Sequence, residues 1–250
     1  MSYVKELRKW ARNSDWNQDL NSDQQNGVPA PAILPEVPAD AELFALPSPE
    51  LCSGSGRNLQ TIIRERRSIR KYSALPMTQA ELSYLLYCSH GFVSVRPGQE
   101  SIAALRTVPS AGCRHPIDTY LAILNVDGLP RGLYRFLPRE HALLLLSRDD
   151  GTLTERVSNS LCGQMFAAQG SAVFYWASDM YRCEWRYTHH AHKLALLDVG
   201  HVCQNLYLAA GEVDSGVCAL DAYHQTLSDE LFALDGDNNF VLYAASVGKC

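Results

Sequence analysis

The stretch Arg66-Arg67-Ser68-Ile69-Arg70-Lys71-Tyr72 has three arginines and a serine in its first five residues. It follows a segment in which Leu59, Ile62 and Ile63 recur at helical spacing, which predicts a helix over residues 58–66. Guanidinium groups bind phosphate oxygens in pairs and keep their charge at any working pH, and a serine hydroxyl adds a further hydrogen bond. The stretch therefore predicts a phosphate site. On this segment alone, a basic helix end stabilised by the helix dipole is the alternative.

The rest of the composition favours a small anionic ligand over a polyanion. The chain has 250 residues, 46% of them hydrophobic, and a net charge of -5. That apolar mass suffices for one large core or two small ones. No global basic field points to nucleic acid or to an anionic membrane surface. The positive charge is clustered instead, as it is over residues 64–71.

Targeting signals and cysteine usage point to one compartment. Residues 1–20 lack the apolar region of a signal peptide, and the longest apolar runs are too short to span a bilayer. Eight cysteines are scattered along the chain without CxxC spacing, which indicates reduced thiols rather than a disulfide framework. We expect a soluble, cytoplasmic protein.

Residues 1–56 differ from the remainder. Six of the twelve prolines fall within residues 28–50, where each prevents regular helix. We expect a Pro-rich N-terminal extension over residues 1–56 and a catalytic domain over residues 57–250. Apolar residues such as Ile33 and Phe44 indicate that this arm packs on another surface. The sequence leaves open whether the arm covers the active site or wraps a dimer.

Helical and strand patterns alternate through the catalytic domain. The segment Thr78-Gln79-Ala80-Glu81 fits a capping box and predicts a helix that runs to about His90. Apolar patterns predict further helices over residues 189–211 and 227–234, the first a buried central helix. Strands are predicted over residues 118–126, 132–136, 142–146, 171–177, 216–220 and 240–247. This order indicates an α+β or α/β fold with helices around one sheet.

Five stretches together resemble the nitroreductase-like flavoprotein family. Residues 66–72 resemble its opening motif, and residues 106–116 (RTVPSAGCRHP) resemble its second motif in the form found in SagB-type dehydrogenases. Residues 128–134, 200–210 and 242–249 agree with the family in the same order. The resemblance covers residues 57–250.

The resemblance implies an α+β fold with a central mixed sheet sandwiched by helices, in an interlocked homodimer with one FMN at each interface. Arg66, Arg67, Ser68 and Arg70 would hold the phosphate and the pyrimidine edge of the flavin. The turn Pro109-Ser110-Ala111-Gly112 would reach the flavin of the partner chain. Further candidates for cofactor binding are Gly216, Val217, Gly248 and Lys249. By themselves, the turn is ordinary loop chemistry and Lys249 a free charge near the chain end.

SagB-type enzymes oxidise azoline rings in peptides, with a Lys-Tyr pair managing the proton beside FMN. The matching residues here are Arg186 and Tyr187. An arginine does not release its proton near neutral pH, so Arg186 would orient or stabilise an anion. Tyr187 is a candidate acid or base if Arg186 lowers its pKa.

Three function classes follow from these residues. The first is an FMN-dependent dehydrogenase acting on a peptide-derived or carrier-bound substrate, with possible biosynthetic partner enzymes. The second is an NAD(P)H-dependent nitro or quinone reductase, and the third a non-catalytic partner subunit that keeps the fold. No metal is expected, because His189, His190 and His192 lack the i, i+4 spacing of helical zinc sites. Asn205 is expected to tie its helix to a neighbouring loop.

Overall fold

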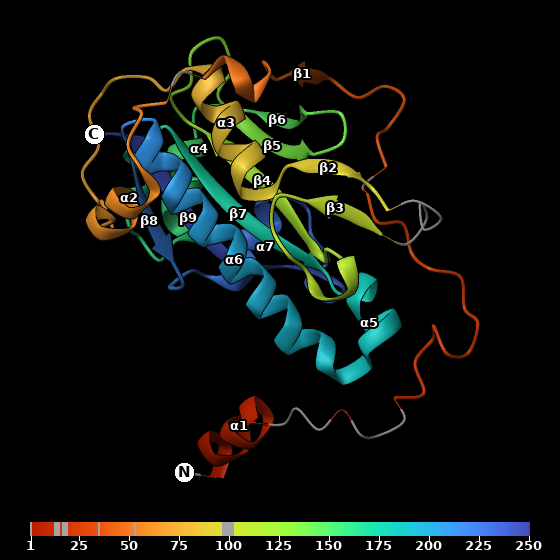
Figure 1. Ribbon diagram of the computed structural model, residues 1–250. Coiled ribbons are helices and arrows are strands. Elements are labelled where there is room, and N and C mark those ends of the chain that lie inside the picture. Colours follow the sequence, from red (N-terminus) through yellow and green to blue (C-terminus); the bar gives the residue numbers. More distant parts are fainter. Residues whose placement is uncertain (1, 13–15, 17–19, 35, 53, 97–102) are drawn as a thin grey trace.

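The computed structural model describes residues 2–12, 16, 20–34, 36–52, 54–96 and 103–250, so part of the predicted extension lies outside the described residues. Its centre is a seven-stranded sheet in the order β1-β6-β5-β4-β7-β9-β8 (Figure 1). The strands are β1 (Leu43–Ala45), β4 (Ile117–Ile123), β5 (Gly132–Leu137), β6 (Ala142–Arg148), β7 (Ala172–Asp179), β8 (Ser215–Leu220) and β9 (Asn239–Lys249). Strands β2 (Phe92–Val95) and β3 (Ala104–Arg106) pair separately.

Helices cover both faces of the sheet. The helices are α1 (Ser2–Arg12), which stands apart from the sheet in Figure 1, and α2 (Leu59–Glu65), α3 (Gln79–His90), α4 (Leu153–Ser160), α5 (Tyr181–Tyr187), α6 (Ala191–Glu212) and α7 (Gln225–Leu231). Helices α3 and α6 lie on one face, and α4 and α7 lie on the other (Figure 1). The expected α+β fold with helices on a central sheet is confirmed.

Strand β7 shows how the sequence builds the two layers. Phe174 and Trp176 belong to the core under α3 and α6, whereas Val173 and Tyr175 belong to the core under α4 and α7. Successive side chains of a strand point to opposite faces, so an unbroken apolar run fills both cores.

The sheet was expected to be mixed, and the described strands pair only antiparallel. The parallel contacts are two isolated bridges, Ser68 with Val217 and Met77 with Val126. They are too short to count as strands, but the first of them fixes the arginine run beside β8.

Local signals placed the helix boundaries well. The capping box of α3 is present: the Glu81 N–H donates to Thr78 Oγ1 at 3.2 Å, and the Thr78 N–H donates to Glu81 Oε2 at 2.8 Å. Helix α6 differs from the prediction of a buried central helix. Leu196 and Leu197 are 46% and 54% exposed, because the chain covers only one side of this helix.

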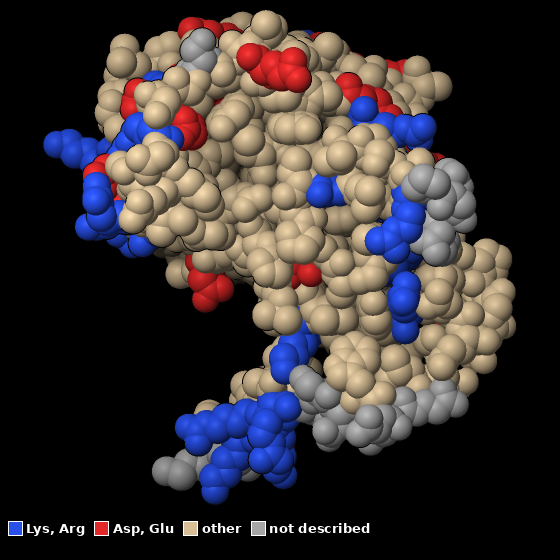
Figure 2. Space-filling view, viewed as in Figure 1, with Lys and Arg blue, Asp and Glu red and all other residues tan. Residues whose placement is uncertain are grey.

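The N-terminal arm contains two elements that the proline pattern did not indicate. Strand β1 pairs with β6 at the edge of the sheet, and α1 precedes the proline-rich part. Figure 2 shows basic side chains gathered over α1 and over α2. Among the described residues, no helix is long and apolar enough to cross a bilayer.

Candidate functional site

The arginine run leaves α2 and lies along the outer edge of β8. Asn58 caps α2 by accepting the Thr61 N–H at 2.9 Å, and the helix ends at Arg66. The run then turns onto β8, where the Ile69 N–H donates to the Val217 carbonyl at 2.9 Å. Strand β8 is the last strand of the sheet, so its free edge is available for this contact.

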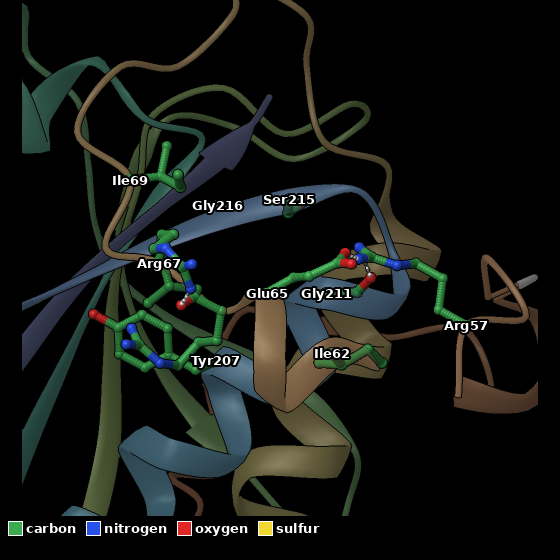
Figure 3. Close-up of a pocket in the computed structure, with 11 residues that line it drawn as sticks. Arg57, Ile62, Glu65, Arg67, Ile69, Tyr207, Gly211, Ser215 and Gly216 are labelled. Atoms are coloured by element: carbon green, nitrogen blue, oxygen red, sulfur yellow. Dashed lines mark hydrogen bonds and ion pairs between the residues drawn. The ribbon is translucent and has the colours of Figure 1, made fainter. Parts of the chain in front are cut away.

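A cavity of about 240 Å³ lies between the run, β8 and the C-terminal part of α6 (Figure 3). Arg57, Arg66 and Arg67 line it together with Glu65, so its lining carries net positive charge. Glu65 pairs with Arg57 and Arg64. Within the described ranges, no carboxylate pairs with Arg66 or Arg67. The cavity therefore suits an anion. The other lining residues are Ile62, Ile69, Tyr207, Gly211, Ser215, Gly216 and Val217.

Tyr207 of α6 joins the run to the sheet. Its hydroxyl lies 3.0 Å from Ser68 Oγ and accepts the Ala219 N–H at 2.9 Å. The Arg66 guanidinium lies over its ring, 5.1 Å from the centroid, which is the geometry of a cation–π contact. Tyr207 thus sets the positions of two predicted cofactor residues, Arg66 and Ser68, although the sequence interpretation did not select it.

The other arginines of the run differ in their surroundings. Arg67 folds back, and its Nη1 donates to the carbonyls of Arg66 at 2.9 Å and Arg64 at 3.1 Å. Arg70 is exposed and does not line the cavity. Burial raises the pKa of the Cys218 thiol, and the charge of Arg70 opposes that effect. Arg70 therefore lies near β8, outside the cavity that Arg66 and Arg67 share.

Two glycines allow the run to pack closely. A Cβ at Gly216 would come within 2.6 Å of the Ile69 Cβ, and one at Gly248 would come within 2.7 Å of the Tyr72 ring. The Tyr72 hydroxyl donates to the Ile69 carbonyl at 2.9 Å. The predicted residues Gly216, Val217 and Gly248 are thus brought together with the run, as the surface against which it packs.

Lys249 has partners within the chain. Its ammonium lies 2.6 Å from Glu81 Oε1 and 2.7 Å from the Val213 carbonyl oxygen, and its side chain is 16% exposed. It is therefore not a free charge near the chain end, and it does not line the cavity. A role toward phosphate stays a prediction.

The predicted flavin turn, Pro109 to Gly112, forms a short 3₁₀ turn against α6. The Ser110 hydroxyl accepts the His115 N–H at 2.9 Å. Gly112 has φ +57°, in the left-handed region that glycine adopts without strain. A Cβ there would overlap the Tyr187 hydroxyl and would lie 3.3 Å from Arg186 Nη1. The structure thus brings the predicted turn and the predicted catalytic pair together.

Tyr187 ends α5 and is a phenol at neutral pH. Burial raises its pKa, and the smaller effect of Arg186, which lies 5.4 Å from the ring centroid, lowers it. The sequence interpretation required Arg186 to lower this pKa, and the net shift is in the opposite direction because burial outweighs the nearby charge. Tyr187 therefore fits a proton or hydrogen-bond donor better than a base.

The arm holds α5. The Trp185 Nε1–H donates to the Val28 carbonyl at 2.9 Å, and the Gln24 N–H donates to the Trp185 carbonyl at 2.9 Å. Trp16 meets the Tyr187 ring edge-on at 5.7 Å. The described part of the arm therefore packs on α5 of its own chain, at the end of the helix that carries Tyr187.

The arginine cavity and the turn lie far apart along α6. Tyr207 belongs to the C-terminal part of this helix, and the turn packs near Asp198, nine positions earlier. At 1.5 Å per residue, that is about 14 Å along the axis. In the part of the chain that the structure describes, Arg66 and Arg67 line one pocket, and Pro109 and Ser110 line another.

The remaining predictions concern metal binding and Asn205. In the part of the chain that the structure describes, no group of three or more His, Cys, Asp or Glu side chains could hold a metal ion. His192 Nε2 lies 2.8 Å from Glu184 Oε1. Asn205 Nδ2 donates to the Cys88 carbonyl of α3 at 3.0 Å and to the Thr107 carbonyl, in the loop after β3, at 3.4 Å. The expected tie to a loop is present, together with one to a helix.

Comparison with known proteins decides the family. The sequence profile of the nitroreductase family matches residues 63–249, three quarters of the chain. The chain belongs to the nitroreductase family. A protein described as a nitroreductase in Methanocaldococcus jannaschii is 29% identical over 180 residues, which cover 70% of this chain and 84% of that protein.

Solved structures agree with this nitroreductase fold. A nitroreductase from Anabaena variabilis superposes with a TM-score of 0.70 at 22% identity; the match covers 84% of this chain, which spans only 42% of that one. The E. coli microcin synthetase McbBCD complex, with truncated pro-MccB17 bound, gives 0.63 at 17% identity, covering 100% of this chain and 92% of that one. A nitroreductase from Exiguobacterium sibiricum, solved with FMN, gives 0.56 at 14% identity, covering 80% and 91%.

Proposed function

We propose that this nitroreductase-family chain is an FMN-dependent oxidoreductase, with the phosphate end of FMN in the Arg66–Arg67 cavity. The observation that carries the proposal is the pair of guanidinium groups there, Arg66 and Arg67, which have no carboxylate partner among the described residues. The Ser68 hydroxyl, 3.0 Å from the Tyr207 hydroxyl, follows them in the chain. The donor chemistry fits a phosphate, since arginine binds it bidentately. FMN-bound relatives with this fold support the choice of cofactor. When bound, FMN would accept or donate a hydride equivalent.

We further propose that each site is built from two chains of a homodimer. Within the described part of one chain, the turn at Pro109–Gly112 and the Arg66 cavity line two different pockets, and the family resemblance implies that the turn reaches the flavin of the partner chain. Leu196 and Leu197 are exposed apolar side chains in the N-terminal half of α6. A second copy packed on these side chains would bring its own turn toward the first copy's cavity.

The dimer is tested by its mass. Light scattering of the wild type should give twice the chain mass, and Leu197→Glu should give monomer that has also lost FMN. A Leu197→Glu dimer that binds FMN normally would contradict the two-chain site. Deleting residues 1–50 asks separately whether the arm contributes to the dimer.

We propose that the substrate is a peptide-derived or carrier-bound heterocycle such as an azoline, as in SagB-type dehydrogenases. The likeness to the microcin synthetase complex, whose structure contains a bound precursor, supports a peptide substrate and partner enzymes. Tyr187 would hold or donate a proton at its phenol oxygen. Arg186, permanently charged beside it, would orient an anionic group of the substrate.

The alternative is an NAD(P)H-dependent nitro or quinone reductase. Stopped-flow mixing of the FMN-loaded protein with NADPH distinguishes the two. Slow flavin bleaching by NADPH, together with azole formation from an azoline peptide, supports the dehydrogenase; rapid bleaching with turnover of a nitroaromatic supports the reductase. A protein that binds no added FMN, and so stays colourless, would exclude both enzymes and favour the third class, a non-catalytic partner subunit.

A further inference from the structure

Thr107 stands two residues before the Pro109–Gly112 turn and is hydrogen bonded to the end of α3. Its hydroxyl donates to the Tyr87 carbonyl at 2.8 Å and accepts the Gly91 N–H at 3.0 Å. Its own N–H donates to the Gly91 carbonyl at 3.0 Å. Because a hydroxyl has one proton to donate, and Thr107 uses it on Tyr87, this side chain has no donor left for a ligand.

The same point is held from α6. Asn205 Nδ2 donates to the Cys88 carbonyl at 3.0 Å and to the Thr107 carbonyl at 3.4 Å. The last carbonyls of a helix have no partner within that helix, so groups from elsewhere satisfy them. Asn205 therefore joins three segments: α3, α6 and the chain that enters the turn.

The turn itself is at the surface. Pro109 and Gly112 are exposed, whereas Val108, directly before them, is 4% exposed and belongs to the core. On its N-terminal side, the turn is therefore fixed at its base, where Val108 is buried and Thr107 is bonded to α3 and α6.

We propose that Thr107 is a positioning residue of the flavin turn. Its bonds to α3, supported by Asn205, fix the base of the turn, and this presents the exposed residues of the turn to the cofactor. Thr107 acts through the backbone and does not itself touch FMN. This inference rests on the proposed FMN function, and one of its tests needs no FMN.

The first test is an FMN titration of the intact protein. Thr107→Val keeps the shape of the side chain and removes the hydroxyl. FMN binding should weaken about tenfold, the effect of about one lost hydrogen bond between the displaced turn and the cofactor. Thr107→Ser restores the hydroxyl and should bind FMN within about threefold of wild type. Normal FMN affinity in Thr107→Val, or no recovery in Thr107→Ser, would overturn the proposal.

The matched control is Ser160→Ala at the end of α4, on the opposite face of the sheet. The Ser160 side chain is buried, and its hydroxyl donates to the Val157 carbonyl of α4 at 2.9 Å, as Thr107 does to a carbonyl of α3. This variant should lose thermal stability and keep its FMN affinity. If it lost FMN as Thr107→Val does, the effect at Thr107 would be general destabilisation and the positioning role would be wrong.

The second test is hydrogen exchange of the cofactor-free protein. The Cys113 and Arg114 amides donate to carbonyls inside the turn, at 3.0 and 3.1 Å. Thr107→Val should accelerate their exchange together with that of the Gly91 amide, and Thr107→Ser should not. Acceleration at Gly91 alone would show that Thr107 only caps α3, which would refute the positioning role.

The exchange result also separates the two ways of failing. If wild type binds no FMN and Thr107→Val still accelerates exchange in the turn, the proposed function fails while the hold of Thr107 on the turn stands. If wild type binds FMN and exchange in the turn is unchanged in Thr107→Val, the cofactor assignment stands and the role of Thr107 fails.

Discussion

The Tyr187 hydroxyl lies directly over the α-carbon of Gly112, in the space that a side chain at position 112 would occupy. The two residues come from α5 and from the turn against α6, and they are 75 positions apart in the sequence. Position 112 therefore requires glycine for two reasons. Its backbone is in the left-handed region, and a side chain there would occupy the space that Tyr187 fills.

Gly112→Ala should displace Tyr187 and strain the turn. The left-handed conformation costs a non-glycine residue about 1–2 kcal/mol, and the overlap with the phenol adds to that. We expect a turnover loss of at least about tenfold, since a small misplacement of a positioned group has large effects. Steady-state kinetics and thermal denaturation measure the two effects.

Gly163→Ala is the matched control for this substitution. Gly163 has φ +77° with no atom within 4 Å of an added Cβ. It should show the backbone cost alone, with normal turnover. Equal kinetics in the two alanine variants would mean that Tyr187 does not depend on the space at Gly112.

Asp118→Asn should be strongly destabilising. Asp118 Oδ1 lies 3.0 Å from Arg182 Nη1, and its Oδ2 lies 2.7 Å from Arg135 Nη2. Burial by itself would raise the pKa of Asp118, and the two guanidinium groups more than offset it, so the carboxylate is charged in the folded protein. Removing one partner of a buried pair costs about 3–5 kcal/mol. Urea denaturation measures the free energy of unfolding. A loss below about 1 kcal/mol in Asp118→Asn would show that its ion pairs with Arg182 and Arg135 contribute little to stability.

Stability should fall as the pH drops below about 6.5, the ordinary histidine value. Burial, followed by the charge of Arg106, lowers the pKa of His115 to about 3 and that of His90 well below its usual range. Above pH 6.5 neither state binds these protons. Below it the unfolded chain takes them up while the folded protein does not, so each histidine removes about 1.4 kcal/mol per pH unit.

His115→Gln tests this pH dependence. The glutamine amide can replace the 2.9 Å contact of His115 Nε2 with the Ala104 carbonyl, and it does not titrate. Denaturation midpoints measured between pH 7 and pH 5 should show a shallower slope than wild type. An identical slope would mean that His115 is protonated in the folded protein.

Lys249→Met should reduce stability more than FMN affinity. The ammonium already forms a salt bridge with Glu81 and donates a hydrogen bond to the Val213 carbonyl. Its loss leaves the partly buried Glu81 carboxylate without a paired cation. We expect a stability loss of about 1–3 kcal/mol. An FMN dissociation constant raised about tenfold with unchanged stability would instead favour the phosphate role.

Elements whose signals are local could be predicted from the sequence, and those that depend on distant partners could not. The capping box of α3 and the arginine run are readable within a few residues. Strand β1 exists because it pairs with β6, about a hundred positions away. Helix α1 does carry a local signal, since Tyr3, Leu7 and Trp10 recur at helical spacing.

The sequence could propose residues for the candidate site, but it could not identify the side chains that contact them. The Tyr207 hydroxyl contacts Ser68 from 139 positions away, and Asp198 of α6 lines the same small pocket as Ser110. Neither partner can be identified from spacing, since a polar residue on an apolar helix gives no sign of what it bonds. The direction of the Tyr187 pKa shift is likewise set by burial, which depends on the fold and cannot be inferred from the neighbouring Arg186 alone.

FMN titration of the cofactor-free protein tests the central claim most directly. Wild type should bind one FMN per chain, and Arg67→Ala should weaken binding about tenfold to hundredfold through loss of a charged phosphate contact. Arg64→Ala, at a side chain that is 70% exposed and outside the cavity, should bind as wild type. A wild type that fails to bind FMN, or an Arg67→Ala variant that binds it equally well, would contradict the account.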